Sequence, residues 1–506
     1  MTEHPLYLGI DAGSSVTKAA LFDAQGRLVG KAARKMPIAR PAPRRVEVDP
    51  LLAWQTLCGV LRDLWTETGV APARVAGVGL TGAMVGLWLL DEGGEPVAPG
   101  INWEDSRAQP LLETMEAADP DMLATIFASS GSALQQGCTL PLLAWTRDHA
   151  PDTLARARHA VSYKDFLRFR LTGEIAADET EASVAPGDTH ARTFSRRMLS
   201  LFGLEAQASL LGPVRPSEAR AGQVTPEAAQ ATGLVAGTPV AIGAGDVPAG
   251  VTGMGGRAPG TVSIILGTTC MLGVATDRPV FTPPGLGLLF PLPGDAWFRA
   301  MVNVAGTLAL DWALDLFCPD WSLDPERYAR AEALVRDVPV GANGVTFLPY
   351  LSESGIIAPT VSAGARGTFL GLTPAHGRSE ILRAVHEGIV LAILDLVDLL
   401  PPSEADAPVL IAGGGARSAT WVQMIADALG RTVTVPDGSE FGALGAAMLA
   451  ATMSDPDSDS FTAMTPPQAR RVVPRAADAP AWRAAHALYA ARRDAVLAAA
   501  DQETLP

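Results

Sequence analysis

Asp246 lies in a setting that suits a catalytic carboxylate. It ends the segment Gly243-Ala244-Gly245-Asp246, which follows the apolar residues 238–242. Small neighbours let a ligand and the backbone approach closely, and they give a carboxylate little to pack against. An aspartate beside glycine is also a frequent turn residue. The sequence thus predicts either a general base at Asp246 or a structural turn.

The first apolar segment of the chain leads into a second group of polar residues. A buried strand is predicted at residues 6–10, followed by Asp11, Gly13, Ser14, Ser15 and Lys18. A tight hairpin here would direct backbone N–H groups and hydroxyls at a phosphate. Asp11 could bind Mg²⁺ through water, since this ion prefers oxygen ligands and keeps several waters. Lys18 could contact phosphate oxygens. The alternative is a type I′ turn whose polar residues bind nothing.

The same order of elements returns in the second half of the chain. Residues 261–277 read strand, Gly267-Thr268-Thr269, strand and Asp, as residues 7–23 do around their own turn. This echo indicates two domains built on one plan, with chance similarity of two hairpins as the alternative. We expect an N-terminal domain over residues 1–250 and a C-terminal domain over 251–506, joined by the glycine-rich residues 250–260. Asp246 would then lie at the interface, and Gly267 and Thr268 would hold phosphates from the opposite side.

A third glycine segment follows a strand predicted at residues 409–412. It consists of Gly413, Gly414 and Gly415, with Ser418 and Gln423 downstream. Three glycines permit a flat ligand to lie against the backbone, so an adenosine could bind here, before the next helix. A plain strand-to-helix turn is the alternative. Neither GxxxxGK[ST] nor GxGxxG occurs in these segments, which excludes a P-loop there.

The composition favours a compact enzyme. The chain has 506 residues, of which 48% are apolar and 18% charged, enough for large cores in more than one domain. A net charge of −15 argues against nucleic-acid binding and against an anionic membrane surface. The four cysteines form no CxxC pair, which argues against a zinc site and suits a reducing cytosol. With no secretory pattern and no apolar stretch long enough to span a bilayer, we expect a cytoplasmic protein.

The candidate residues need a scaffold of alternating strands and helices. Apolar spacing predicts further strands at residues 19–23, 75–80, 87–91 and 344–350 and helices at 51–64, 308–317, 379–400 and 481–500. Hairpins mixed with βα units indicate an α/β fold with mixed sheets. The acidic residues 453–467 are predicted to form a loop, and the last helix to pack back on the body.

The three glycine segments, in this order, resemble the sugar kinase/actin/heat-shock ATPase superfamily. Residues 367–372 (Gly-Thr-Phe-Leu-Gly-Leu), with Glu380, Ala384 and Glu387 downstream, resemble the C-terminal signature of the FGGY carbohydrate kinases. His386 departs from that signature, at a position that is usually aliphatic or aromatic. The N-terminal pattern of the family is similar to residues 163–166, 171–174 and 178–183. The resemblance implies two duplicated actin-like (ribonuclease H-like) domains, with mixed β-sheets flanked by helices and a cleft between them.

The resemblance also implies an ATP-dependent kinase with a Mg²⁺ cofactor. Asp246 would accept the proton of a sugar hydroxyl as this attacks the γ-phosphoryl group in line. Asp11 would be the magnesium-associated aspartate, acting through water. The remaining cofactor-binding residues would be Gly13, Ser14, Ser15 and Lys18 in the first phosphate motif, Gly267 and Thr268 in the second, and Gly413, Gly414, Gly415, Ser418 and Gln423 around adenosine.

In this family the substrate pocket draws on the segment that reads Met84-Val85 here. Xylulokinases carry Met-His at this place and glycerol kinases Arg-Glu, so this chain lacks the His contact to a D-xylulose hydroxyl. A site built to hydrogen-bond a hydroxyl discriminates by about 10⁴-fold or more, so this change should alter the preference. Trp103 and Asp105 match the family's Trp-x-Asp-x-Arg segment. They could stack on a sugar and bond a hydroxyl, or serve as a core Trp and a structural partner of Arg107.

The expected activity is phosphorylation of a terminal hydroxyl of a small ketose, foremost a pentulose. A polyol kinase for erythritol or a related alditol is the second expectation, because the His is absent. From another class, a catalytically silent ATP-binding regulator is the alternative, against which the intact Asp246, Asp11 and Lys18 argue. Members of the family are often dimers, so the resemblance allows a homodimer, and no nucleic-acid or membrane partner is expected.

Overall fold

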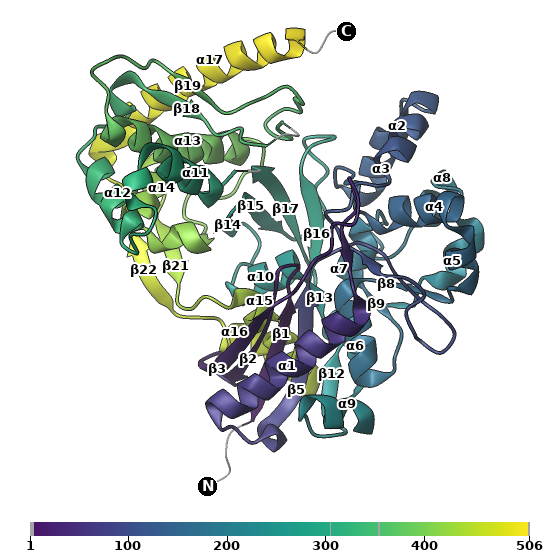
Figure 1. Ribbon diagram of the computed structural model, residues 1–506. Coiled ribbons are helices and arrows are strands. Elements are labelled where there is room, and N and C mark those ends of the chain that lie inside the picture. Colours follow the sequence, from purple (N-terminus) through teal and green to yellow (C-terminus); the bar gives the residue numbers. More distant parts are fainter. Residues whose placement is uncertain (1–4, 304, 353–354, 504–506) are drawn as a thin grey trace.

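The chain folds into two lobes, each built around a mixed β-sheet (Figure 1). The computed structural model describes residues 5–303, 305–352 and 355–503. Within these residues the first sheet has seven strands, β1 (Leu6–Ala12), β2 (Val16–Asp23), β3 (Leu28–Lys35), β5 (Val75–Gly82), β11 (Arg220–Gln223), β12 (Pro239–Ala241) and β13 (Ala244–Gly245). The second sheet, over the same described ranges, has seven as well, β14 (Val262–Leu266), β15 (Cys270–Thr276), β16 (Leu288–Leu292), β17 (Ala296–Asn303), β20 (Val409–Ala412), β21 (Val433–Pro436) and β22 (Gln468–Val472).

The two sheets repeat each other's strand pairing. In the first, β1 pairs antiparallel with β2 and β2 with β3, β1 runs parallel to β5, β5 parallel to β12, and antiparallel β11 forms the edge. In the second, β14 pairs antiparallel with β15 and β15 with β17, β14 runs parallel to β20, β20 parallel to β21, and antiparallel β22 forms the edge. The predicted α/β fold with two actin-like domains is therefore confirmed, and the echo between two turns extends to the whole sheets.

Helices lie on both faces of the first sheet. Alternate residues of a strand point to opposite faces, so Leu8 and Ile10 of β1 pack in one core with α1 (Pro50–Thr68). Tyr7 packs on the other side against α15 (Phe441–Ser454). A Cβ on Gly9 would lie 1.8 Å from the carbonyl oxygen of Ala443 in α15, so this helix can rest on the strand only because residue 9 is glycine.

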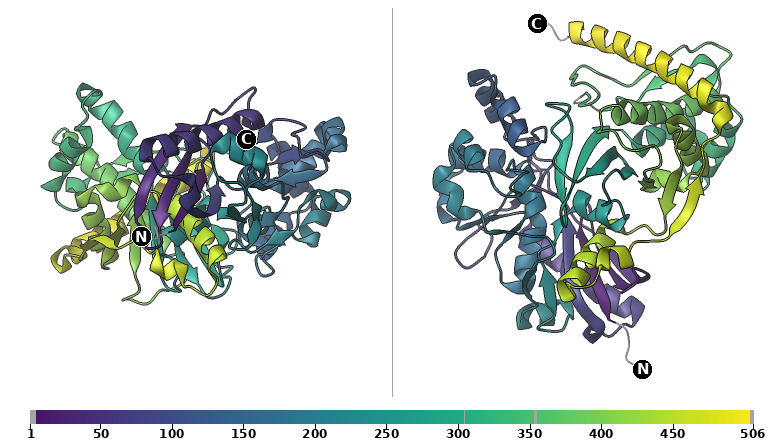
Figure 2. Two further views of the ribbon diagram at one scale, coloured as in Figure 1. Left: turned by 90° about the horizontal axis from the view of Figure 1, so that it is seen from below. Right: turned by 180° about the vertical axis from the view of Figure 1, so that it is seen from behind.

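Helix α15 belongs to the second half of the chain, yet it contacts β1 and β5 of the first sheet and the short helix α10 (Asp246–Gly253). Both views in Figure 2 show its yellow-green ribbon among the purple strands of the first lobe. The contact with α10 is close, since a Cβ on Gly445 would lie 2.0 Å from the carbonyl oxygen of Ala249. The two sequence halves therefore interlock at this point.

The second lobe is organised around the long helix α13 (Arg378–Val397). It lies in one core with residues of the second sheet and of the surrounding helices. These helices are α11 (Thr307–Phe317), α12 (Arg327–Arg336), α14 (Ala419–Leu429) and α17 (Ala479–Glu503). Trp482 and Tyr489 of α17 are buried in that core, in agreement with the prediction that the last helix packs back on the body.

The first lobe carries an insertion between β5 and β11, with a core of its own. Its helices are α2 (Gln109–Ala118), α3 (Met122–Ser130), α4 (Thr139–His149), α5 (Pro151–Arg156), α6 (Tyr163–Thr172), α7 (Glu179–Val184) and α8 (Arg196–Leu201). Of these, α6 packs in the core of the first sheet and not in that of the insertion. Short strand pairs in the structure are β4 (Glu47–Val48) with β7 (Gly100–Ile101), β6 (Trp88–Leu90) with β8 (His159–Val161), β9 (Ala177–Asp178) with β10 (Val214–Arg215), and β18 (Thr346–Leu348) with β19 (Thr368–Leu370). Helix α9 (Pro226–Thr232) follows β11.

Two segments predicted from the sequence as connections contain parts of helices. The glycine-rich residues 250–260, predicted to join the two domains, begin inside α10, which continues to Gly253. A Cβ on Gly253 would lie 2.0 Å from the Phe441 carbonyl oxygen at the start of α15. The acidic residues 453–467, predicted as a loop, contain the end of α15 and the short helix α16 (Ser460–Ala463). Asp459 caps that helix by accepting the Thr462 N–H at 3.2 Å, so an acidic residue starts a helix here.

Candidate active site

Asp246 is the first residue of α10 and directly follows β13. Strand β13 pairs with β5 of the first sheet, and α10 contacts β16 of the second, so the carboxylate lies where the lobes meet. Its Oδ1 accepts the Val247 N–H at 2.8 Å, and the side chain is accessible to solvent. Loss of hydration between the lobes, and then the negative charge of Asp11, raise the pKa of Asp246 to about 7. A carboxylate with this pKa can take up a proton near neutral pH.

Asp11 lies at the end of β1, and the sheet register brings it near Asp246. Asp11 and Ala244 are both paired with Thr81 of β5, on opposite sides, so their Cα atoms lie about 10 Å apart at ordinary strand spacing. Burial and the charge of Glu440 raise the pKa of Asp11 to about 6, against the opposing effect of Lys18. Two carboxylates with raised pKa values thus share one edge of the sheet.

The first predicted phosphate turn is held by residues from elsewhere in the fold. The Ser14 hydroxyl accepts the Trp103 Nε1–H at 2.8 Å, and the Ser15 carbonyl accepts the Met36 N–H at 2.8 Å. Lys18 lies 3.2 Å from Glu440, the residue that precedes α15. The turn is therefore attached both to the insertion and to the helix that crosses from the second half.

The second predicted phosphate turn is fixed by the start of α11. The carbonyl of Gly267 accepts the Thr307 N–H at 2.7 Å, and that of Thr268 accepts the Gly306 N–H at 2.8 Å. The Thr268 side chain is exposed. Gly413 adopts φ 95° beside this turn, and a Cβ there would lie 2.5 Å from the Leu266 carbonyl oxygen. The structure therefore joins the second phosphate turn to the glycine segment, which local sequence reasoning had treated separately.

A cavity of about 360 Å³ adjoins the glycine segment. Gly414, Gly415 and Ser418, three of the residues predicted to surround adenosine, line it. Its other lining residues are Thr307, Leu310, Asp311, Tyr328, Ala329, Glu332, His386, Arg417 and Trp421. The Ser418 hydroxyl donates to Glu332 Oε1 at 2.9 Å. Gln423 is not brought to this cavity, because its side-chain amide donates to Asp427 at 2.8 Å and to the Val473 carbonyl at 3.0 Å.

His386, the departure from the family signature, lies in the lining of the same cavity. Its Nδ1 is 2.7 Å from the Leu382 carbonyl oxygen, and its ring is 4.8 Å from that of Trp421. Burial lowers the pKa of His386 to about 4, so the imidazole is neutral at physiological pH. Its place in the lining could not be read from the sequence, because it depends on how α13 and α14 pack.

The Met84-Val85 segment is a strained turn next to Asp246. A Cβ on Gly245 would lie 2.4 Å from Met84 Sδ, which places the methionine beside the residue that precedes the base. Val85 has φ 57°, a left-handed conformation that β-branched residues rarely adopt. Both side chains pack in an apolar cluster that includes Cys138 and Val184.

Trp103 and Asp105 differ in what they offer a ligand. Trp103 is 45% exposed, so its ring face is available while its N–H bonds Ser14. Asp105 is 0% exposed, and its oxygens accept from the Val46 N–H at 2.7 Å and from the Arg107 side chain at 2.8 Å. Of the two roles considered for Asp105, the structure supports the structural one: the carboxylate is the buried partner of Arg107 and does not face a sugar site.

The largest of the cavities described, about 840 Å³, contains none of the predicted site residues. It is mainly apolar and lies among α3, the segment before β16 and residues 357–361. No helix among the described residues is long and apolar enough to cross a membrane. Over those residues no group of three or more His, Cys, Asp or Glu side chains could hold a metal ion by itself.

Comparison with known proteins agrees with this geometry. The chain is 32% identical to a xylulose kinase from Escherichia coli over 457 residues, which is 89% of this chain and 91% of that protein. It is 32% identical to an erythritol kinase from Brucella abortus over 463 residues, covering 88% of this chain and 87% of that protein. A crystal structure titled as a xyloylose kinase from Brucella ovis superimposes with a TM-score of 0.86 at 31% identity, covering 97% and 99% of the two chains.

Two family models match most of the chain. The N-terminal domain of the FGGY family of carbohydrate kinases matches residues 6–253, and the C-terminal domain of that family matches residues 262–454. The duplicated sheets, the carboxylates at their junction and these matches lead to one conclusion. The chain belongs to the FGGY family of carbohydrate kinases and is a carbohydrate kinase.

Proposed function

We propose that this kinase transfers the γ-phosphoryl group of Mg-ATP to a terminal hydroxyl of a pentulose, with Asp246 as the general base. The observation that carries the proposal is the position of Asp246 at the junction of the two sheets, with a pKa raised to about 7. A base is most effective when its pKa lies near the working pH. A silent regulator would have no need of such a group.

The residues present fit a magnesium nucleotide. Mg²⁺ usually binds proteins through one or two carboxylates and keeps several waters, so the lack of a three-residue metal cluster among the described residues is compatible with it. Asp11 offers a carboxylate near the proposed base, and the Thr81 hydroxyl beside it has no hydrogen-bond partner among described residues. When bound, the ion would neutralise charge on the phosphate oxygens and between the two carboxylates.

The candidate residues would have separate roles in binding and in phosphoryl transfer. The cavity beside Gly414 would hold adenosine, and the turns at Gly13–Ser15 and Gly267–Thr268 would hold the phosphates. Asp246 accepts the proton of the acceptor hydroxyl as the oxygen bonds to the γ-phosphorus, and the bond to the β-phosphate oxygen breaks with its electrons leaving on ADP. Closing the lobes would exclude water, which otherwise competes with the sugar.

The acceptor preference rests on Val85. It presents an apolar side chain where xylulokinases have His, and it packs with Met84 and Cys138. A ketopentose is favoured by the similarity to the xylulose kinase of Escherichia coli. An alditol such as erythritol is the second candidate, favoured by the similarity to the erythritol kinase of Brucella abortus and by the missing imidazole. A cytoplasmic location and a homodimer stay predictions from the sequence.

The test is ADP release from Mg-ATP with a panel of pentuloses, hexuloses and alditols. We expect strong turnover with one ketopentose and its loss in Asp246→Asn, whose side chain cannot take up the proton. Turnover with an alditol alone would replace the first acceptor class with the second. Absence of turnover across the panel, with ATP binding intact, would contradict the proposed activity and favour the silent regulator.

A further inference from the structure

One short helix contacts both parts of the proposed acceptor site. In the first turn of α7, the Thr180 hydroxyl accepts the Gly245 N–H at 2.9 Å, and Glu181 Oε2 accepts the Val85 N–H at 2.8 Å. Gly245 directly precedes the proposed base. Val85 is in the turn proposed to meet the sugar. Two neighbouring residues of one helix thus hold two backbone positions that must be correctly spaced for proton transfer.

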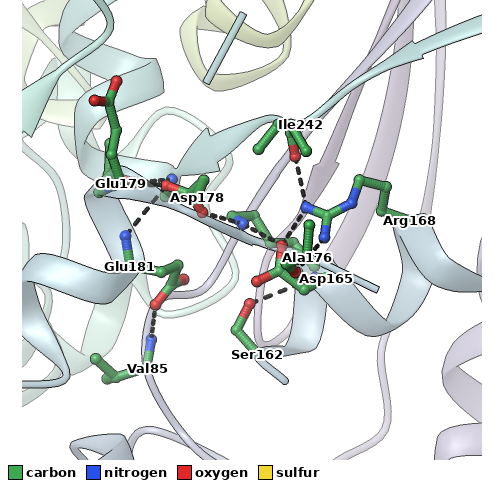
Figure 3. A network of polar contacts seen from close by, with 12 residues as sticks. Val85, Ser162, Asp165, Arg168, Ala176, Asp178, Glu179, Glu181 and Ile242 are labelled. Atoms are coloured by element: carbon green, nitrogen blue, oxygen red, sulfur yellow. Dashed lines mark hydrogen bonds and ion pairs between the residues drawn. The ribbon is translucent and has the colours of Figure 1, made fainter. Parts of the chain in front are cut away.

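The helix is itself anchored in a buried ionic network (Figure 3). Asp178 caps α7 by accepting the Thr180 N–H at 2.7 Å and the Glu181 N–H at 3.1 Å, and it also pairs with Lys164 and accepts from the Thr180 hydroxyl. Lys164 is 2.6 Å from Asp165, and both are at most 2% exposed. Breaking a buried ion pair by removing one partner is strongly unfavourable, so the network makes α7 a rigid support.

The same network reaches the segment that leads to the base by a second route. Arg168 pairs with Asp165 at 2.5 Å and donates to the Ile242 carbonyl at 2.8 Å. Ile242 and Gly245 are therefore both fixed to residues of the insertion. Side chains of the insertion thus hold the backbone before Asp246 at two points, whereas Val85 depends on Glu181 alone among the contacts described for its N–H.

The conformation of Val85 explains why its attachment matters. A left-handed backbone is unfavourable for a β-branched residue, which prefers extended conformations. The buried Val85 N–H would also lose its partner without Glu181, and an unpaired buried donor is unfavourable. Glu181 thus opposes the intrinsic preference of residue 85. Burial raises the pKa of Glu181 well above its usual range, so a neutral glutamine should reproduce its contact.

We propose that Thr180 and Glu181 are positioning residues that set the spacing between base and acceptor, Thr180 through Gly245 and Glu181 through Val85. The inference rests on the proposed roles of Asp246 and of the Met84-Val85 turn. It predicts that the two residues affect different kinetic constants. Displacing the base should lower kcat, and releasing the turn should raise the KM for the acceptor.

The experiment compares Thr180→Val, Glu181→Ala and Glu181→Gln with Thr232→Val as the matched control. Thr232 is likewise buried, and its hydroxyl accepts the Leu234 N–H at 3.2 Å beside α9, away from the site. We expect kcat to fall about tenfold or more in Thr180→Val. The KM for the acceptor should rise about tenfold in Glu181→Ala, the loss expected for an unpaired buried N–H. Glu181→Gln and the control should stay close to wild type, as should the KM for ATP in all four.

A rescue distinguishes positioning from general damage. Glycine adopts positive φ without steric cost, so Val85→Gly should relieve the backbone strain that the tether opposes, while the residue 85 N–H keeps its need for a partner. The rise in acceptor KM caused by Glu181→Ala should therefore be clearly smaller when it is measured in the Val85→Gly background. An equal rise in both backgrounds would overturn the role of Glu181, and a Thr180→Val variant with unchanged kcat would overturn that of Thr180.

Amide hydrogen exchange tests the two positioning contacts without relying on the proposed enzymatic activity. The Val85 amide should exchange faster in Glu181→Ala and the Gly245 amide faster in Thr180→Val, with the other amide unchanged. Wild-type protein that phosphorylates no acceptor would contradict the proposed function by itself. Exchange rates that do not respond to these substitutions would overturn the inference even if the enzyme is active.

Discussion

The raised pKa of Asp246 predicts a specific pH dependence of catalysis. With a pKa of about 7, roughly half of the free enzyme has its base deprotonated at neutral pH and about one-eleventh at pH 6. We therefore expect kcat/KM for the acceptor to be roughly tenfold lower at pH 6 than at pH 8, with a limb that rises by about one decade per pH unit below pH 7. Initial rates of ADP release from pH 5.5 to 9, at low Mg-ATP so that free enzyme predominates, would measure it.

The physical causes of the raised pKa of Asp246 suggest two control variants. Loss of hydration between the lobes is the first cause and the charge of Asp11 the second, so Asp11→Asn should move the limb of the remaining activity to lower pH. Asp246→Asn has no group to titrate, and its residual rate should lack the limb. A limb centred below pH 5 in the wild type, or one that persists in Asp246→Asn, would refute the assignment of the base.

Three further outcomes follow from the same contacts. Asp246→Asn should raise Tm at pH 8, because it removes a carboxylate whose charged form is disfavoured in the folded state. The raised pKa makes the stability of the wild type fall as pH rises from about 4 to 7. In thermal scans the gain in Tm should therefore disappear below about pH 4. Val85→His should increase kcat/KM for D-xylulose over erythritol by about tenfold or more, and an unchanged ratio would contradict the role of residue 85. In α15, Gly442→Ala should raise Tm, because alanine has the higher helix propensity. It should also lower kcat, because its Cβ would lie 3.0 Å from Asp11 Oδ2 and would displace this carboxylate. A kcat equal to that of the wild type would show that Asp11 can shift without loss of activity.

Local patterns in the sequence point to those candidate site segments that lie within one turn. The strand before Asp11, the repeated turn at Gly267 and the glycines at 413–415 each show their composition within a few residues. The structure puts these segments at strand ends of two sheets with matching topology. The pairing of Asp11 and Ala244 with one residue of β5 needed the sheet register, which no short segment contains.

Residues whose role depends on distant partners could not be predicted. Asp105 accepts hydrogen bonds from Val46 and Arg107, and Gln423 donates to Asp427 and Val473, so packing engages both predicted polar side chains within the protein. Thr180 and Glu181 were visible only as part of a family pattern. Their significance follows from hydrogen bonds to residues 65 and 96 positions away along the chain.

The position of α15 has a consequence for how the protein is made. The ribosome completes all strands of the first sheet long before it reaches residues 441–454. One face of that sheet, with Tyr7, Ala20 and Phe22, therefore stays uncovered until α15 has been synthesised. Until then the nascent chain exposes an apolar surface and lacks the helix that fits against Gly9. Synthesis of the N-terminal half alone should therefore yield a chaperone-dependent fragment, and the finished fold should form only when nearly the whole chain has emerged.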